Sequence, residues 1–568
     1  MQTVWNQHYL IWGQDLLVSA LIAAVPIFLL LFLLGVRRRP AWEAGLAGFI
    51  ATLALAIAGY GMSARHAFSA AAYGAAFGVF PITWIIFSAI VLYRITVETG
   101  KFETIKDSVG RITSDKRLQI LLIAFAFGAF LEGGAGFGTP VAVAAAMMVG
   151  LGFSALDASA ICLLANTAPV AFGAIGIPVI TLAGITGLPL DKLSADVGRV
   201  CAPLSFIVPA YLIAAVGGRK ALKDVWPALL VCGGTFAGVQ FLVSNYIGAP
   251  LTDILSSLSA IAALVVLLRF WHPPAVPIAE TGGGSFRLKA LAENGKEMER
   301  QSDIATVSLV LEQPPVHLAP RRVLIAWMPY ILLVVFVLAW GFKPVQEVLN
   351  VLTAKFPWPW LHREIQRMPP IVGRPSPYAA VFTMNWLSAA GTSCMLAALV
   401  SAAVLRVRMS TLLRILVTVA RQLFLPTITV TLVLAMAFVM NYCGATGTLG
   451  LAFAATGSLF PFFSALLGWL GVFLTGSDTS SNALFGNLQV VTAHRLGFGP
   501  SLIAAANSVG GVMGKMISLQ TIAVAAAATG LTVAEQAKLF RFALRHSLLL
   551  AATVGMEVLV YAYVFGMN

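Results

Sequence analysis

Long apolar runs recur along the whole chain, and they constrain its fold more than any other feature. A helix rises about 1.5 Å per residue and a hydrocarbon core is about 30 Å thick, so about 20 apolar residues cross a membrane. Of the 568 residues, 59% are hydrophobic and 10% are charged, a composition too apolar for a soluble domain. A transmembrane β-barrel would alternate apolar and polar residues in short segments, which these runs do not. The sequence predicts an all-α polytopic membrane protein.

Twelve runs are predicted to cross the bilayer, and two more are predicted to be re-entrant hairpins. The expected spans are 15–34, 43–61, 67–93, 156–187, 203–216, 227–247, 251–268, 323–341, 378–404, 423–441, 501–530 and 547–565, and the hairpins are 118–148 and 462–490. The first run lacks the basic segment of a cleavable signal, so we expect it to be retained.

The basic residues sort by loop. With the N-terminus outside, 26 of the 36 Lys and Arg fall in loops predicted to be cytoplasmic. This sorting accounts for the net charge of +13 without a nucleic-acid partner. It predicts periplasmic N- and C-termini.

The sequence also repeats internally. "GAFLEGGAGFG" at 128–138 aligns with "GVFLTGSDTSS" at 471–481, and "LGF", Asn and Gly matches follow in the same order. Three spans precede each hairpin, but the first set starts outside and the second starts inside. This pattern predicts an inverted repeat, the plan of many secondary transporters. The expected organisation is a first repeat (1–216), a connecting span pair (217–269), a polar cytoplasmic linker rich in Gly and Pro (270–320) and a second repeat (321–568).

The hairpin turns and two further breaks predict a central binding site. Irregular backbone at membrane depth is tolerated only where protein buries it or where it lines a cavity. The breaks are expected at "NTAP" (166–169) and "NSVGG" (507–511), where free N–H groups would attract an anion. The candidate substrate-binding residues are Gly134, Gly136, Thr139, Asn166, Thr167, Ser477, Thr479, Ser480, Ser481, Asn482, Asn507 and Lys515.

Few ionisable groups lie at membrane depth. Glu132 and Asp478 are the candidates for proton coupling, although Glu132 could instead be a structural acid and Asp478 a helix cap. Glu557 is more readily interpreted as pairing within the scaffold. Lys515 requires a negative partner, which could be Glu132, Asp478 or a substrate carboxylate, and we expect the substrate.

The same stretches resemble a known family. "GAFLEGGAGFGTPVA", "NTAPVAFGAIGIP", "LGWLGVFLTGSDTSSNALFGNLQ" and "GGVMGKMIS" are similar to those of bacterial L-lactate permeases, as is "AYGAAFGVFPITWII" at 72–86. The resemblance covers essentially the whole chain and is weakest in the linker. It implies proton-coupled uptake of L-lactate, and for some members D-lactate or glycolate, across the bacterial inner membrane. It also implies kinship with transporters that move substrate by an elevator motion.

Other classes of function explain less of the sequence. The seven histidines lie in loops or at span ends, and the five cysteines form no CxxC pair, so neither an enzyme, a metal site nor a cofactor other than the co-transported proton is expected. A sodium-coupled anion carrier of the same architecture is the alternative, and a channel is a weaker one. Lactate and glycolate differ by one methyl group, worth about 1–3 kcal/mol of discrimination, so the preferred substrate stays open. The oligomeric state also stays open, a homodimer included.

Overall fold

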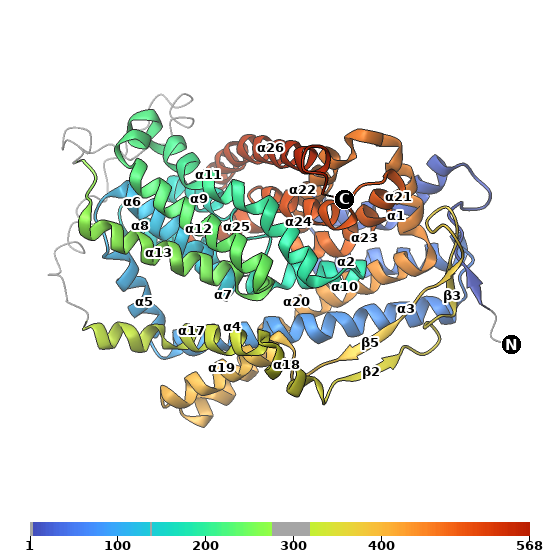
Figure 1. Ribbon diagram of the computed structural model, residues 1–568, viewed down its shortest axis with the longest axis horizontal. Coiled ribbons are helices and arrows are strands. Elements are labelled where there is room, and N and C mark those ends of the chain that lie inside the picture. The colour runs from blue at the N-terminus through green and yellow to red at the C-terminus, as the bar shows by residue number, and fades with distance from the viewer. Residues whose placement is uncertain (1–3, 137–138, 275–318, 568) are drawn as a thin grey trace.

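The computed structural model describes residues 4–136, 139–274 and 319–567, and this part of the chain is mostly helical. Figure 1 shows an elongated molecule whose β-strands gather at the end that holds the N-terminus. Within the described residues, twelve helical segments are long and apolar enough to span a membrane. Most of the predicted linker, together with residues 137 and 138 of the first hairpin turn, lies outside the described residues. The expected all-α polytopic fold is confirmed.

The first half runs from three membrane-length segments to a hairpin, a broken helix and one long helix. Its elements are α1 (Leu16–Gly35), α2 (Ala41–Ala54), η1 (Leu55–Gly59), α3 (Ala64–Phe77), η2 (Gly78–Thr83), α4 (Trp84–Glu98), α5 (Lys101–Gly110), α6 (Lys116–Gln119), η3 (Ile120–Phe127), α7 (Gly128–Gly134), α8 (Thr139–Gly150), α9 (Ala155–Ala165), η4 (Ala174–Gly176), α10 (Ile177–Thr186) and α11 (Leu190–Asp224). A connecting pair follows, formed by α12 (Trp226–Tyr246), η5 (Ala249–Leu251) and α13 (Thr252–Phe270).

The second half repeats this order. Its elements are α17 (Pro320–Gly341), α18 (Lys343–Asn350), β2 (Ala354–Pro357), β3 (Ile365–Arg367), β4 (Ser376–Pro377), β5 (Val381–Met384), α19 (Ala390–Val404), α20 (Met409–Cys443), α21 (Ala445–Phe453), η6 (Ala454–Leu459), α22 (Phe460–Thr475), α23 (Asp478–Leu496), α24 (Pro500–Lys515), α25 (Leu519–Thr529) and α26 (Val533–Tyr563).

The contacts between the halves are reciprocal. Helix α2 packs against α20, and its counterpart α19 packs against α4. In the same way α1 contacts α21 while α17 contacts α5, and α8 contacts α25 while α23 contacts α10. Helix α9 contacts α26, and α24 contacts α11. For each contact between a helix of the first half and one of the second, the corresponding helices with the halves exchanged are also in contact. A twofold relation between two repeats produces this pattern.

Several predicted boundaries are wrong. The expected span 156–187 is two shorter helices, α9 and α10, separated by the predicted break at 166–169. The spans at 203–216 and 423–441 belong to helices of 35 residues each, because polar ends extend beyond the apolar windows. The expected start of a span at 378 is wrong, since residues 381–384 pair with β2 and α19 begins at Ala390. The expected domain boundary at 216 stays a prediction; it lies within α11, close to Gly218, whose φ of 67° interrupts the helical geometry.

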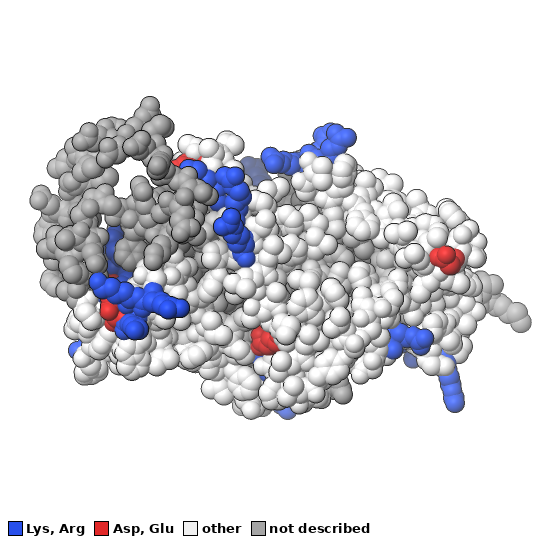
Figure 2. Space-filling view, turned by 90° about the horizontal axis from the view of Figure 1, so that it is seen from above, with Lys and Arg blue, Asp and Glu red and all other residues white. Residues whose placement is uncertain are grey.

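The strands tie the N-terminus to the loop between α18 and α19. Strand β1 (Trp5–Asn6) runs parallel to β3, which is antiparallel to β4. The Gln7 side chain donates 2.9 Å hydrogen bonds to the carbonyls of Asn441 and Tyr442 at the end of α20. Many large apolar side chains are exposed on the described helices, and Figure 2 shows a face with few charged side chains.

The hairpin α22–α23 is held against α24 by backbone contact. A Cβ at Gly468 would meet the carbonyl of Asn507, and one at Gly510 would meet the carbonyl of Ala465. Small residues permit such close approach between helices in membranes, where burial of apolar surface contributes little to association. This packing fixes the second hairpin relative to the helix that ends at Lys515.

Candidate functional site

The first hairpin meets the second half of the chain at a buried ion pair. Glu132 lies in the last turn of α7, and Lys515 is the last residue of α24. The Lys515 Nζ donates to Glu132 Oε1 at 2.8 Å, and the two side chains are 12% and 3% exposed. Breaking a buried pair from one side leaves an uncompensated charge, so each residue requires the other or a substitute.

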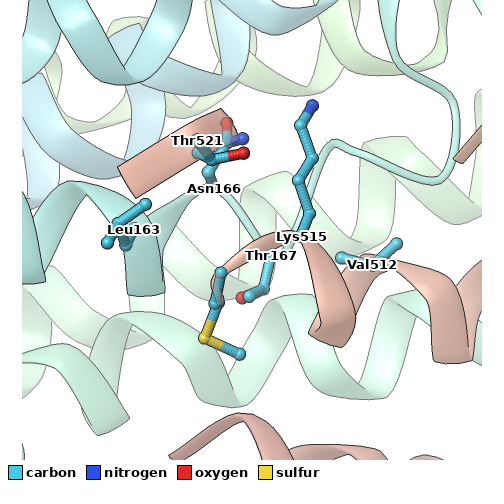
Figure 3. Close-up of a pocket in the computed structure, with 7 residues that line it drawn as sticks. Leu163, Asn166, Thr167, Val512, Lys515 and Thr521 are labelled. Carbon is cyan, nitrogen blue, oxygen red and sulfur yellow. The ribbon is translucent and has the colours of Figure 1, made fainter. Parts of the chain in front are cut away.

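A narrow crevice of about 160 Å³ lies beside this pair (Figure 3). It is too narrow in this conformation to hold a water molecule, so a ligand would have to open it. Figure 3 shows the Lys515 side chain extended, with its ammonium end turned away from the Val512 and Thr167 side chains. The lining residues are Leu163, Asn166, Thr167, Val512, Lys515, Met516 and Thr521.

The break after α9 contributes two polar side chains to the crevice. Asn166 is the C-terminal cap residue of α9 and is 7% exposed, yet its Oδ1 has no hydrogen-bond partner within the described part of the chain. The Thr167 hydroxyl donates to the Leu164 carbonyl at 2.7 Å. A buried amide oxygen without a partner is costly, and a bound hydroxyl or water would satisfy it.

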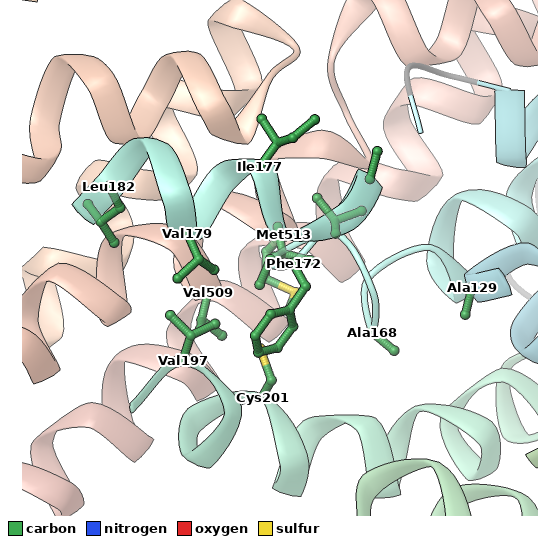
Figure 4. Packing of buried hydrophobic residues seen from close by; sticks show 14 of the residues in the cluster. Ala129, Ala168, Phe172, Ile177, Val179, Leu182, Val197, Cys201, Val509 and Met513 are labelled. Carbon is green, nitrogen blue, oxygen red and sulfur yellow. The ribbon is translucent and has the colours of Figure 1, made fainter. Parts of the chain in front are cut away.

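Apolar packing surrounds the rest of this break. Figure 4 shows Phe172 with Cys201 of α11 and Met513 of α24, all of them buried. The irregular backbone from 166 to 173 is therefore enclosed by protein rather than exposed to lipid, as membrane depth demands.

The second hairpin carries a hydrogen-bond network. Asp478 Oδ2 accepts from the Ser508 hydroxyl at 2.6 Å and from the Asn482 amide at 3.3 Å. The Asn507 amide donates to Asn482 Oδ1 at 2.8 Å, and the Gln489 amide donates to Asn507 Oδ1 at 3.1 Å. These hydrogen bonds connect α23 to α24, although Asp478 Oδ1 and Gln489 Oε1 have no partner among the described residues.

The network also reaches the broken helix of the first half, because the Asn482 amide lies 3.2 Å from the carbonyl of Pro178 at the start of α10. The predicted break at 507–511 is wrong, since α24 runs without interruption from Pro500 to Lys515. The glycines there allow close packing on α22 instead. The break lies at 516–518, before α25.

The L-lactate permease sequence profile matches residues 19–565. The glycolate permease GlcA of Escherichia coli K12 is 43% identical over 567 residues, covering 99% of this chain and 98% of that protein. The L-lactate permease of Bacillus subtilis 168 is 43% identical, covering 99% of each chain. The chain belongs to the L-lactate permease family. Among solved structures, Neisseria gonorrhoeae MtrF matches with a TM-score of 0.42 and 13% identity over 84% of this chain and 80% of that one.

In this member of the L-lactate permease family, the predicted site residues fall into groups. Lys515, Asn166 and Thr167 line the crevice, and Glu132 bonds to Lys515 beside it. Asp478, Asn482 and Asn507 belong to the network. Gly134 packs on Tyr330, and Gly136 packs on Ala174 with a φ of 55°.

The hydroxyl residues of the second hairpin have local roles. Ser477 caps α23 by accepting from the Ser480 N–H at 3.2 Å, and the Ser481 hydroxyl donates to the Gly468 carbonyl at 3.2 Å. Thr479 is partly exposed on the first turn of α23. The side chain of Thr139 lies outside the described residues. Of the three partners weighed for Lys515, the structure shows Glu132, and contact with a substrate stays a prediction.

Sequence reasoning missed Asp253. This carboxylate lies in the first turn of α13, is 2% exposed, and neither oxygen has a hydrogen-bond partner among the residues that are described. A Cβ at Gly133 would lie 2.9 Å from its Cβ, so Asp253 packs directly on the hairpin beside Glu132. The signal was "GAPLTD" at 248–253, a Gly–Pro break followed by an acid at the start of an apolar span.

Proposed function

We propose that this protein carries L-lactate and glycolate, both small 2-hydroxy monocarboxylates, into the cell by proton symport. Membership of the family over nearly the full chain supports the substrate class, because the two closely matching relatives described above are named an L-lactate permease and a glycolate permease. The observation that carries the proposal is the crevice, which is lined both by Lys515 and by Asn166, whose amide oxygen has no partner among the described residues.

The crevice offers complementary groups for a 2-hydroxy acid. The Lys515 ammonium can donate to the substrate carboxylate, and the Asn166 side chain can accept from the adjacent hydroxyl. In the structure Lys515 bonds to Glu132. Substrate binding then exchanges one carboxylate for another at the same ammonium, so the loss of the protein ion pair is offset by the new one.

The driving force must come from a cation. Lactate is an anion at neutral pH, since a carboxyl group ionises with a pKa of about 4. Moving one negative charge inward against an inside-negative potential costs about 2.3 kcal/mol per 100 mV. Symport of a proton removes this penalty and allows accumulation.

The proposed setting is the bacterial inner membrane, with periplasmic termini and an elevator-type motion. The reciprocal contacts of the two halves support an inverted repeat, because a twofold axis in the membrane plane exchanges the roles of corresponding helices. The crevice is closed here, so transport requires the break after α9 to separate from the end of α24.

Flux into proteoliposomes that contain the purified protein tests this function. We expect saturable uptake of radiolabelled L-lactate and glycolate, driven by an inward proton gradient, unchanged when choline replaces Na⁺, and accompanied by counterflow. Loss of uptake without Na⁺ would favour the sodium-coupled alternative. Linear flux without counterflow would favour a channel.

A further inference from the structure

We propose that Asp253, which lies outside both repeats, is the group that carries the coupled proton. This inference rests on the proposed lactate and glycolate transport and names the residue that links it to protons. It begins from three ionisable groups around the end of the first hairpin: the buried acids Glu132 and Asp253 and the partly buried Lys515.

If all three groups are ionised, their charges sum to −1 rather than to zero. Lys515 supplies one positive charge, and Glu132 already bonds to it at 2.8 Å. Asp253 lies close enough to interact electrostatically with both residues. Throughout the described residues, no hydrogen-bond donor reaches either of its carboxylate oxygens. An unpaired buried carboxylate takes up a proton rather than remain charged, so Asp253 holds a proton in this conformation.

Substrate binding changes this balance. If Lys515 turns to the substrate carboxylate, Glu132 loses its counter-charge and the cluster gains one negative charge. With Asp253 protonated, the cluster carries one uncompensated negative charge fewer than with Asp253 ionised. The substrate therefore binds more tightly to the protonated cluster, and by linkage the bound substrate holds the proton more tightly.

Asp253 can also exist without its proton. It lies in the first turn of α13, where the dipole of the helix favours a negative charge. When the cluster opens to one side, the carboxyl O–H bond breaks, the proton passes to water and the carboxylate remains. On the opposite side, water supplies the proton that restores the carboxyl group.

The other ionisable groups that face Asp253 do not replace it. Cys201 of α11 interacts with it electrostatically but is a buried thiol. Tyr330 of α17 packs on Gly134 at the same hairpin end, and it is 1% exposed. Glu132 is already engaged by Lys515. Asp478 also interacts electrostatically with Glu132 and Lys515, but it accepts hydrogen bonds from Ser508 and Asn482. Among the described acids of this cluster, Asp253 is therefore the one with neither an ion pair nor a hydrogen bond.

The test compares Asp253→Asn with Asp196→Asn in proteoliposomes. The control makes the same chemical change at an acid that is also 2% exposed, but Asp196 pairs with Arg199 at 3.0 Å. The probes are radiolabelled L-lactate for accumulation and exchange, and a pH-sensitive dye inside the vesicles for lactate-linked proton entry.

We expect Asp253→Asn to reduce gradient-driven accumulation at least about tenfold and to abolish lactate-linked acidification, while exchange stays measurable. As the pH rises above the range in which Asp253 loses its proton, the wild-type KM for exchange should increase by up to about tenfold per pH unit. In the variant, KM should depend much less on pH. Asp196→Asn should behave like the wild type.

Wild-type coupling in Asp253→Asn overturns the inference, and so does loss of exchange in a variant that remains folded by size-exclusion chromatography and thermal melting. If Asp253→Asn does not fold, Asp253→Glu decides: a displaced pH profile of KM supports the proton role, and an unchanged profile overturns it. Failure of the proposed function is distinct, since it would appear as wild-type protein that exchanges neither lactate nor glycolate.

Discussion

The ends of the two hairpins differ in how many of their buried polar groups are hydrogen-bonded. At the second hairpin, Asp478 and Asn482 bond to Ser508 and Asn507 within a connected network. At the first hairpin, an ion pair lies beside the carboxylate of Asp253, which has no hydrogen-bond partner in the described part of the chain. The acids of both regions are buried. Asp478 accepts two hydrogen bonds through Oδ2, although its Oδ1 has no partner among the described residues, whereas Asp253 accepts none there. A satisfied network rigidifies, whereas groups without partners are where a substrate and a proton can bind.

The largest effect is expected at the ion pair. Lys515→Met should lower uptake at least about 100-fold and destabilise the fold by about 3–5 kcal/mol, because it strands Glu132 without a counter-charge. Adding Glu132→Gln should restore thermal stability but not uptake. The measurements are lactate flux and the midpoint of thermal unfolding with and without lactate. Stabilisation by lactate equal to that of the wild type in Lys515→Met would show that the lysine does not contact substrate.

A substitution at the backbone contact between α22 and α24 tests whether the second hairpin is rigidly held. Gly510→Ala should destabilise the protein by about 1–3 kcal/mol, because its Cβ would meet the Ala465 carbonyl between two helices. Gly238→Ala in α12 is the control, since a Cβ there meets nothing within 4 Å. Thermal unfolding of both variants measures the difference. Equal stability of the two variants would mean that α22 and α24 are not locked together.

The same substitution at two asparagines should separate the regions. Asn482→Ala removes a network member and should cost about 1–3 kcal/mol of stability, while the folded fraction keeps its KM. Asn166→Ala should leave stability nearly unchanged and raise KM several-fold, since its Oδ1 has no partner within residues 4–136, 139–274 and 319–567. Melting curves and exchange kinetics decide this comparison. If the two effects are reversed, the assignment of rigid and binding regions is wrong.

The smallest effect is expected at Asp478. Asp478→Asn keeps the shape of the side chain and one acceptor for Ser508, so we expect about 1 kcal/mol of destabilisation and coupling like that of the wild type. Proton entry linked to lactate measures the coupling. Its loss in a folded variant would transfer the proton role to the second hairpin and contradict the contrast drawn here.

Features that depend on local pattern were predictable from the sequence. The length of the apolar runs predicted most spans. The acid Glu132 and the glycines that follow it predicted the end of the first hairpin. The break at Asn166 was predicted from its polar residues and following proline, and it is confirmed. Lys515 was singled out because an ammonium is costly at membrane depth.

Features that depend on contacts between distant segments were not predictable. Asp253 and Gly133 are far apart in sequence, and their proximity follows from how α13 packs on α7. The glycines at 510 and 511 resembled a break because sequence does not distinguish a glycine that bends a helix from one that admits a neighbour. The extended segment at 381–384 resembled a span because hydropathy does not distinguish a strand from a helix.

The parallel pairing of Trp5 with Ile365 has a consequence for how the chain is made. The partner of the N-terminal strand leaves the ribosome about 360 residues later. At about 5–20 residues per second, translation separates the two by roughly 20–70 s. Throughout that interval the N-terminal strand has no partner to pair with. It can pair with β3 only after the first eight membrane-length segments have been synthesised. Closure of this strand therefore marks a late event in biogenesis, and an N-terminal fusion that obstructs it would act on assembly rather than on transport.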